Sequence, residues 1–228
     1  HGLHAAGGAT PITGLTLVGC IFGLDAGGAT DLGNGADGAH LENVHDSTIG
    51  GALFWQPCLF SGNDDDGVEV RLDCRALTFL GSRFGTDLFA NAAIGNDGDG
   101  LVLSGNNCLV GGDAEGEANV MAGNRRNGLL VDGIGNHIEG NRVGTDTSGT
   151  VVLSNNTADG ANDAGVKMPP ILFQTENNLL IGNLISGNHQ ANLRIGAGSI
   201  ARGNTIGPDI SGDAILTGRP FGIGVFLR

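Results

Sequence analysis

The residues best suited to chemistry in this chain are aspartates that recur just before a repeated glycine-apolar segment. In order along the chain they are Asp37, Asp64, Asp65, Asp66, Asp97 and Asp99. Crowded carboxylates repel one another, so they spread into water, take up protons or share a hard cation through their oxygens. The turn therefore has three interpretations: a solvated acidic turn paired with arginine, a Ca²⁺ site, or a catalytic site.

The first two interpretations depend on neighbouring residues. One repeat later the same turn carries Arg125 and Arg126, which could neutralise Asp97 and Asp99. The segment Asn96-Asp-Gly-Asp-Gly100 is also typical of a calcium loop, in which oxygen ligands bind the ion. The predicted Ca²⁺ ligands are Asp37, Asp64, Asp66, Asp97 and Asp99.

Catalysis at this turn would be cleavage of a polysaccharide by Asp66, Asp99 and Arg126. A lyase similar to the pectate lyases needs acidic calcium ligands and a basic arginine or lysine, and an inverting hydrolase needs two carboxylates about 6.5–9.5 Å apart. Sugar grooves usually present aromatic rings, whereas the chain has one Trp, no Tyr, and Phe residues that fall mostly in core positions. We therefore predict no catalytic residue and keep polysaccharide cleavage as the alternative.

Two short apolar patterns must position these turns. The first, glycine-apolar-x-apolar, has the period of two that indicates a strand with one buried face. It recurs about every 30 residues, starting at Gly38, Gly67, Gly100, Gly128, Gly165, Asn192 and Gly222. The second places an apolar residue two positions after a Cys, Ser or Asn, at Phe22, Phe60, Phe84, Met121, Val143, Ile185 and Ile206. Strands this short bury their apolar faces only by stacking, so the repeats predict a parallel solenoid of about seven coils.

The residues that open the second pattern form a polar column. After two cysteines it continues through Ser82, Asn119, Asn141, Asn183 and Asn204. Stacked amide side chains can bond to one another and to the backbone of the turn. We therefore predict that this column is a structural ladder.

The cysteines suggest a pairing scheme. Cys20 and Cys58 begin the polar column in adjacent coils, where a spacing of about 5 Å suits a disulfide. Cys74 and Cys108 follow the glycine-apolar strands of the next two coils. Four cysteines allow three pairings, of which we favour Cys20–Cys58 and Cys74–Cys108, with four free thiols as the alternative. The bridges would indicate an oxidising compartment.

Overall charge narrows the class of partner. A formal net charge of −13 opposes nucleic acid and anionic membrane surfaces, both of which need clustered Lys and Arg.

Two further segments have a structural and a functional interpretation each. The loop Ala52-Leu-Phe-Trp-Gln-Pro57 is unusually apolar, and we expect it to be buried against its own coil rather than to form a contact patch. His1 and His4 could bind copper, but a mobile polar tail is the favoured interpretation.

Several segments resemble a known group of proteins. Gly140-Asn-Arg-Val-Gly-Thr-Asp-Thr-Ser-Gly149, Ser47-Thr-Ile-Gly-Gly51 and Leu184-Ile-Ser-Gly-Asn188 are similar to the tandem units of bacterial secreted right-handed parallel β-helix repeat proteins. The resemblance covers nearly the whole chain and implies an all-β, single-domain right-handed parallel β-helix over residues 1–228, with 1–14 as an N-terminal arm or cap. It also implies an extracellular or cell-surface location. It does not settle activity, because adhesive, structural and carbohydrate-active proteins share this fold.

Both ends of the repeat look open in sequence. At the C-terminal end, Gly222-Ile-Gly-Val-Phe-Leu-Arg228 contains only the first strand of a coil. An open coil end favours head-to-tail self-association, with a fragment of a longer solenoid or a cap within residues 1–14 as the alternative. We therefore predict a non-catalytic extracellular structural or adhesive protein, either a filament subunit or one that binds a cell-surface glycan, with Ca²⁺ as its only candidate cofactor.

Overall fold

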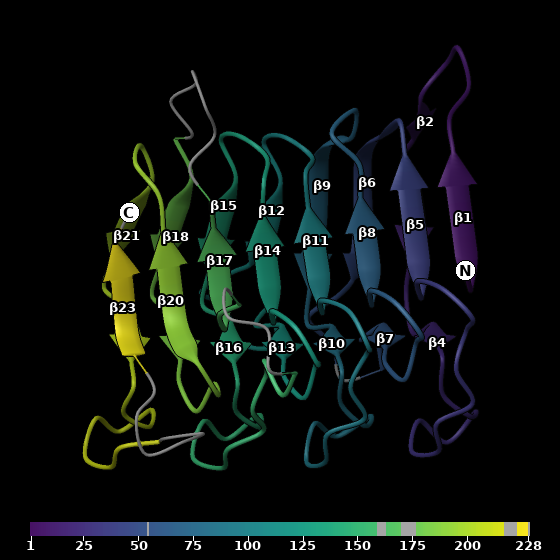
Figure 1. Cartoon of the computed structure of the whole chain (residues 1–228). Coiled ribbons are helices and arrows are strands. Elements are labelled where there is room, and N and C mark those ends of the chain that lie inside the picture. Colours follow the sequence, from purple (N-terminus) through teal and green to yellow (C-terminus); the bar gives the residue numbers. More distant parts are fainter. Residues whose placement is uncertain (54, 159–162, 170–176, 217–222, 228) are drawn as a thin grey trace.

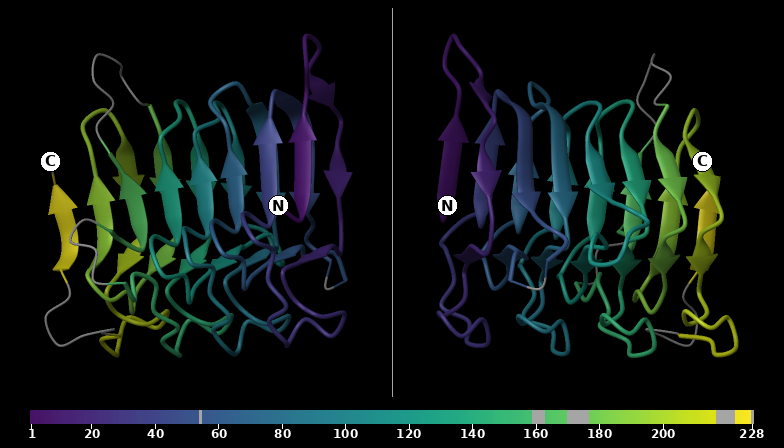
Figure 2. Two further views of the ribbon diagram at one scale, coloured as in Figure 1. Left: turned by 45° about the vertical axis from the view of Figure 1, so that its right-hand side comes forward. Right: turned by 180° about the vertical axis from the view of Figure 1, so that it is seen from behind.

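The computed structural model describes residues 1–53, 55–158, 163–169, 177–216 and 223–227. Within these ranges the regular elements are all strands, arranged in three parallel sheets that the chain visits in turn (Figure 1). The stack is therefore a solenoid, and Figure 2 shows the same arrangement from two other sides. No helix in the described ranges is long and apolar enough to cross a membrane.

The strands of each sheet succeed one another from coil to coil. The first sheet contains β1 (Leu3–Ala6), β5 (Ala39–Glu42), β8 (Val68–Val70), β11 (Leu101–Leu103), β14 (Leu129–Val131), β17 (Val166–Met168), β20 (Ala191–Ile195) and β23 (Ile223–Leu227). The second contains β2 (Ile12–Thr13), β6 (Val44–Gly50), β9 (Arg75–Leu80), β12 (Leu109–Gly111), β15 (His137–Glu139), β18 (Leu179–Ile181) and β21 (Ile200–Arg202), with β3 (Thr16–Leu17) also paired to β6. The third contains β4 (Ile21–Phe22), β7 (Leu59–Phe60), β10 (Arg83–Phe84), β13 (Val120–Met121), β16 (Arg142–Val143), β19 (Leu184–Ile185) and β22 (Thr205–Ile206).

Pairing in register creates the core. In the first sheet Val68 lies opposite Leu101 and Leu101 opposite Leu129, and all three side chains are buried. In the third sheet the rings of Phe60 and Phe84 stack with their centroids 5.3 Å apart. Identical inward positions therefore fall in columns, which confirms the predicted all-β stack of parallel strands. The first 14 residues, where an arm or cap was expected, supply β1 and β2 of the first coil.

The polar column lies at the turn between the second and third sheets. The backbone N–H of Ser82 donates to Asn119 Oδ1 at 2.9 Å, and Asn119 Nδ2 donates to Asn141 Oδ1 at 2.9 Å. The same two bonds link Asn141 to Asn183 and Asn183 to Asn204. Each amide thus satisfies a buried turn N–H that the parallel sheets leave without a partner.

A second ladder, which the sequence analysis missed, lies at the turn between the third and first sheets. Its side chains again bond from one coil to the next, and its members are Asn34, Asn63, Asn96, Asn124, Asn155 and Asn188. Two turns of the coil are therefore held by stacked asparagines.

A small hairpin follows the third-sheet strand in every second coil, after β4, β10, β16 and β22. Asp87 Oδ1 accepts the backbone N–H groups of Asn91 and Ala92 at 2.7 and 3.1 Å and so closes the hairpin that follows β10. Asp25, Asp146 and Asp209 do the same in their own coils. These aspartates therefore stabilise the hairpin loops. The hydrogen bonds that their carboxylates accept lower the pKa of Asp25 and Asp209.

The predicted disulfides are wrong, because all four cysteines are free thiols. Cys20 does lie opposite Cys58, since β4 and β7 pair in register. Cys74, in contrast, donates its thiol to the carbonyl of Leu41 in the preceding coil at 3.3 Å, and the register that pairs Leu109 with Thr78 places Leu77, not Cys74, opposite Cys108. Burial raises the pKa of the Cys58 and Cys108 thiols to about 11, which leaves little thiolate for exchange.

Replacing a ladder asparagine should destabilise the protein. The Asn119 amide accepts the backbone N–H of Ser82 and donates to the carbonyl of Phe79, each at 2.9 Å. Asn119→Ala removes both bonds and leaves these two buried backbone groups without a partner. Two unsatisfied buried groups should lower the free energy of unfolding by about 3 kcal/mol. Chemical denaturation measures the change, and Asn91→Ala at an exposed loop position is the control, expected to be near neutral. Equal effects of the two substitutions would contradict a structural ladder.

Candidate functional site

The acidic turn before the first sheet is a third ladder, built from carboxylates. Asp37 Oδ1 accepts the backbone N–H of Asp66 at 3.2 Å, and Asp66 Oδ1 accepts that of Asp99 at 2.6 Å. Asp99 Oδ1 in turn accepts the backbone N–H of Asn127 at 2.7 Å. The column therefore changes from carboxylate to amide without changing its geometry. Three residues that the sequence marked as metal or catalytic candidates are thus engaged with the backbone.

Stacking carboxylates perturbs their protonation. Burial, together with the neighbouring charges of Asp99, Asp65 and Asp37, raises the pKa of Asp66 to about 7. Burial also raises the pKa of Asp99, against the backbone hydrogen bond from Asn127. The pKa of Asp65 is raised as well, by burial and by Asp37. Each proton taken up relieves the repulsion within the column.

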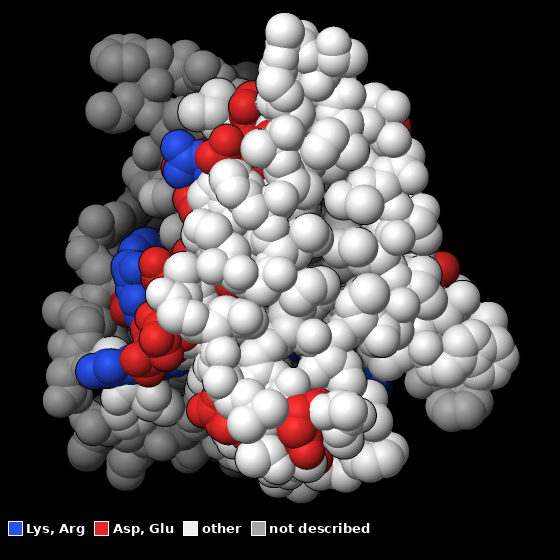
Figure 3. Space-filling view, turned by 90° about the vertical axis from the view of Figure 1, so that its right-hand side faces the viewer, with Lys and Arg blue, Asp and Glu red and all other residues white. Residues whose placement is uncertain are grey.

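The remaining predicted acids point elsewhere. Asp64 and Asp97 are exposed, and Asp97 Oδ1 lies 3.6 Å from Arg125 Nη1, as an arginine-paired turn would require. Arg126 Nε lies 3.8 Å from Asp163 Oδ2. Figure 3 shows acidic side chains gathered along one edge of the molecule with basic ones beside them. The acidic turn therefore carries much of its own counter-charge.

The predicted Ca²⁺ ligands do not all gather in one place. Among the described residues, the group of three carboxylates whose oxygens lie within 4.8 Å of one another is Asp37, Asp65 and Asp66. Asp64 and Asp97 lie outside this group. Its members already serve the ladder or lie at the solvent edge.

A different face of the molecule is hollowed. A depression of about 910 Å³ lies on the outer side of the third sheet. Its walls come from residues 51–53 and 55–57 between β6 and β7, from Glu115 and Gly116 between β12 and β13, and from the hairpin after β10. Trp55 and Phe89 line it and are 61% and 68% exposed. The expectation that the Trp55 loop is buried against its own coil is therefore wrong.

Arg83 supplies the charge of this hollow, which we call the aromatic hollow. Its guanidinium donates through Nη1 to the carbonyl of Gly81 at 2.9 Å, while its buried Nε has no partner among the described residues. Burial lowers the pKa of Arg83 to about 10, and the nearby charge of Arg142 contributes to this. The side chain therefore stays charged at neutral pH and gives the hollow a positive charge.

A smaller hollow of about 420 Å³ adjoins the first and shares Glu115 and Gly116 with it. Arg142 lines it, and its Nε is also buried without a partner in the described part of the chain. Arg83 on β10 and Arg142 on β16 therefore lie on the same face of the third sheet. Both are half-buried, and each lies opposite Val120 of the strand between them, β13. Sequence analysis did not find this site, since its residues are far apart in the chain.

The raised pKa of Asp66 predicts a pH-dependent stability. Because the folded-state pKa of about 7 lies above the ordinary value of 3.8, the stabilisation by the proton is complete at low pH and is lost as pH rises towards 8. Asp66→Asn keeps an Oδ1 acceptor, as Asn127 does, and carries no charge. We expect it to be more stable than the wild type by on the order of 2 kcal/mol at pH 8 and similar at pH 4.

Thermal unfolding at both pH values measures this difference. Asp64→Asn is the control, because Asp64 has an exposed side chain outside the ladder. An equal gain from both substitutions would show that net charge, and not the buried column, sets the effect.

Comparison with models of known protein families and with curated proteins returned no match for this chain. Function must therefore be inferred from the contacts of its own residues.

Proposed function

We propose that this protein is a right-handed parallel β-helix that works outside the cell as a non-catalytic adhesive scaffold and binds an acidic cell-surface glycan in the aromatic hollow. Right-handed connections are nearly universal between parallel strands of one sheet. The observation that carries the glycan proposal is the pairing of two exposed aromatic rings with a half-buried arginine in one depression.

The chemistry of the hollow fits a sugar ring. Trp55 and Phe89 offer apolar faces on which the C–H face of a pyranose can stack. The Arg83 guanidinium lines the hollow and can donate to a carboxylate or sulfate oxygen, and Glu115 can accept from hydroxyls. Short-range contacts of this kind tolerate the net charge of −13, because exposed charges are screened beyond about 8 Å at physiological salt.

The state of the acidic turn supports a non-catalytic role. Asp66 and Asp99, the carboxylates that polysaccharide cleavage would use, each accept a backbone N–H bond within the ladder. Arg126, the candidate base, lies against Asp163. Recruiting these groups for catalysis would leave buried turn N–H groups unpaired, at a cost of about 1–3 kcal/mol each.

Binding to soluble polysaccharides tests the proposal. In affinity electrophoresis at physiological salt, polygalacturonate and alginate should retard the protein and dextran should not. Trp55→Ala should lower the affinity about five- to tenfold, because a stacked aromatic ring contributes on the order of 1–1.5 kcal/mol. Leu72→Ala is the matched control, since Leu72 is 71% exposed on the turn between β8 and β9.

The same mixtures report on the enzymatic alternative. Reducing ends or unsaturated products that disappear in Asp66→Asn would contradict a non-catalytic function. Equal retardation of wild type and Trp55→Ala would refute binding in the aromatic hollow.

A further inference from the structure

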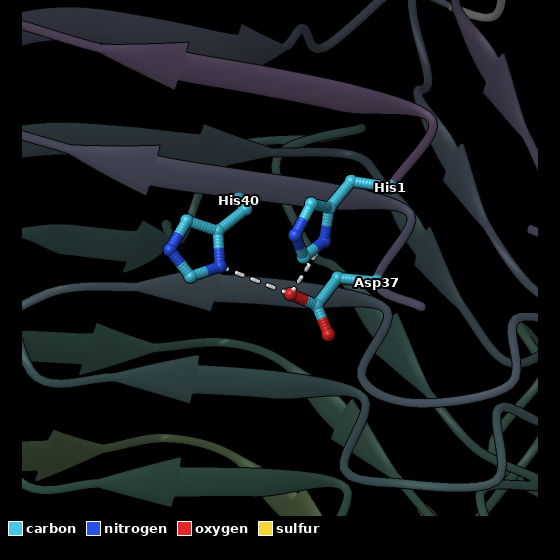
Figure 4. Close-up of side chains that lie close together, drawn as sticks. All are labelled: His1, Asp37 and His40. Carbon is cyan, nitrogen blue, oxygen red and sulfur yellow. Dashed lines mark hydrogen bonds and ion pairs between the residues drawn. The ribbon is translucent and has the colours of Figure 1, made fainter. Parts of the chain in front are cut away.

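We propose that the first coils of the solenoid hold a transition-metal site formed by His1, Asp37 and His40. The sequence separates these residues, but β1 and β5 pair in register with His4 opposite His40, and Asp37 lies two residues before β5. Figure 4 shows the two imidazole rings converging on the Asp37 carboxylate. The site is distinct from the aromatic hollow, and Asp37 is the one residue that it shares with the Ca²⁺ set expected from sequence.

The donor atoms are close to the spacing that a small cation requires. His1 Nδ1 lies 3.0 Å and His40 Nδ1 lies 3.1 Å from Asp37 Oδ2, and all three donors lie within 4.8 Å of one another. Tetrahedral Zn²⁺ with ligands about 2.0–2.2 Å away places its donors about 3.4 Å apart. Small side-chain adjustments would therefore admit the ion.

Asp37 is held in place for this role. Its side chain is only 4% exposed, and Oδ1 accepts the backbone N–H of Asp66, which leaves Oδ2 facing the histidines. The ladder thus fixes one ligand before any ion arrives. A rigid carboxylate lowers the conformational cost of binding.

His40 is oriented by a second carboxylate. Its Nε2 lies 3.0 Å from Glu42 Oε1, two residues along the same strand. In metal sites a histidine commonly donates its far nitrogen to a carboxylate, which fixes the ring and directs the other nitrogen to the ion. Here that arrangement presents Nδ1 to Asp37 Oδ2. Glu69 Oε2, 2.8 Å from the same Nδ1, adds negative charge beside the site.

The donor set selects the class of ion. Two imidazole nitrogens and one carboxylate oxygen suit Zn²⁺, Cu²⁺ or Ni²⁺, whereas Ca²⁺ takes six to eight oxygens. Nearby His4 contacts the His40 ring edge-on with a centroid distance of 5.2 Å and supports its position. We therefore infer a transition-metal site with three protein ligands.

Isothermal titration of the metal-free full chain with Zn²⁺ tests the inference. One Zn²⁺ should bind per chain, and Ca²⁺ should give no heat at the same concentration. Asp37→Asn, which keeps the ladder acceptor, and His40→Gln should each weaken Zn²⁺ binding at least tenfold. Both should still unfold cooperatively in the absence of metal, which separates loss of the site from loss of the fold.

His137→Gln is the matched control. His137 and Glu139 repeat the spacing of His40 and Glu42 on another sheet, with Nε2 and Oε2 3.2 Å apart, but they belong to none of the three-ligand groups among the described residues. Zn²⁺ affinity should be unchanged in this variant. An equal loss of Zn²⁺ affinity in His137→Gln and His40→Gln would overturn the proposal, because Zn²⁺ would then be binding to surface histidines without preference for this site.

Acetylating the α-amino group of the chain distinguishes Zn²⁺ binding by the imidazole site from chelation by a terminal amine. Its Zn²⁺ affinity should stay within about twofold of the unmodified chain, because the donor from residue 1 is the ring nitrogen Nδ1. Loss of binding on acetylation would overturn the proposal. Trp55→Ala should bind Zn²⁺ normally, so the result does not depend on whether the glycan proposal is correct.

Discussion

The structure depends on one constraint, that every buried turn N–H must find an acceptor in a neighbouring coil. Parallel sheets satisfy the strands, but the corners between sheets leave backbone groups pointing along the axis. Asn119 and Asn124 solve this at two different corners with the same pair of contacts, an Oδ1 acceptor for one coil and an Nδ2 donor for the next. Core packing and surface loops are built on corners fixed in this way.

The turn that holds Asn124 also carries the carboxylate column, in which charged groups accept the same kind of bond with different consequences. Asp66 and Asp99 accept bonds as an amide would, yet they add negative charge to a partly buried column and their pKa values rise. At Asp37 the second carboxylate oxygen is left over and contacts His1 and His40. A carboxylate in a ladder can therefore serve structure and ligand binding at once, because its two oxygens point in different directions.

Much of the fold could be predicted because equivalent residues of successive coils recur in the sequence at regular spacing. A residue such as Val68 or Leu101 signals its place by its alternation and by recurrence in the next coil. The ladder through Asn124 could have been found from the recurring Gly-Asn after the third-sheet strands. The pairing of Cys74 with Cys108 could not, because the register that pairs Leu109 with Thr78 places Leu77 opposite Cys108, while the Cys74 thiol bonds to the preceding coil. Such a local offset leaves no trace in repeat spacing.

The sites were harder to predict, because they arise where the repeat is broken. The aromatic hollow exists since long loops in two coils flank the short turn at Gly81, and only the fold brings Trp55 near Phe89. Likewise, His1 meets His40 because a whole coil separates them in sequence and one strand spacing separates them in space. In a solenoid, residues about one repeat apart are neighbours. Chemistry should therefore be sought by comparing successive coils position by position rather than by scanning for contiguous motifs.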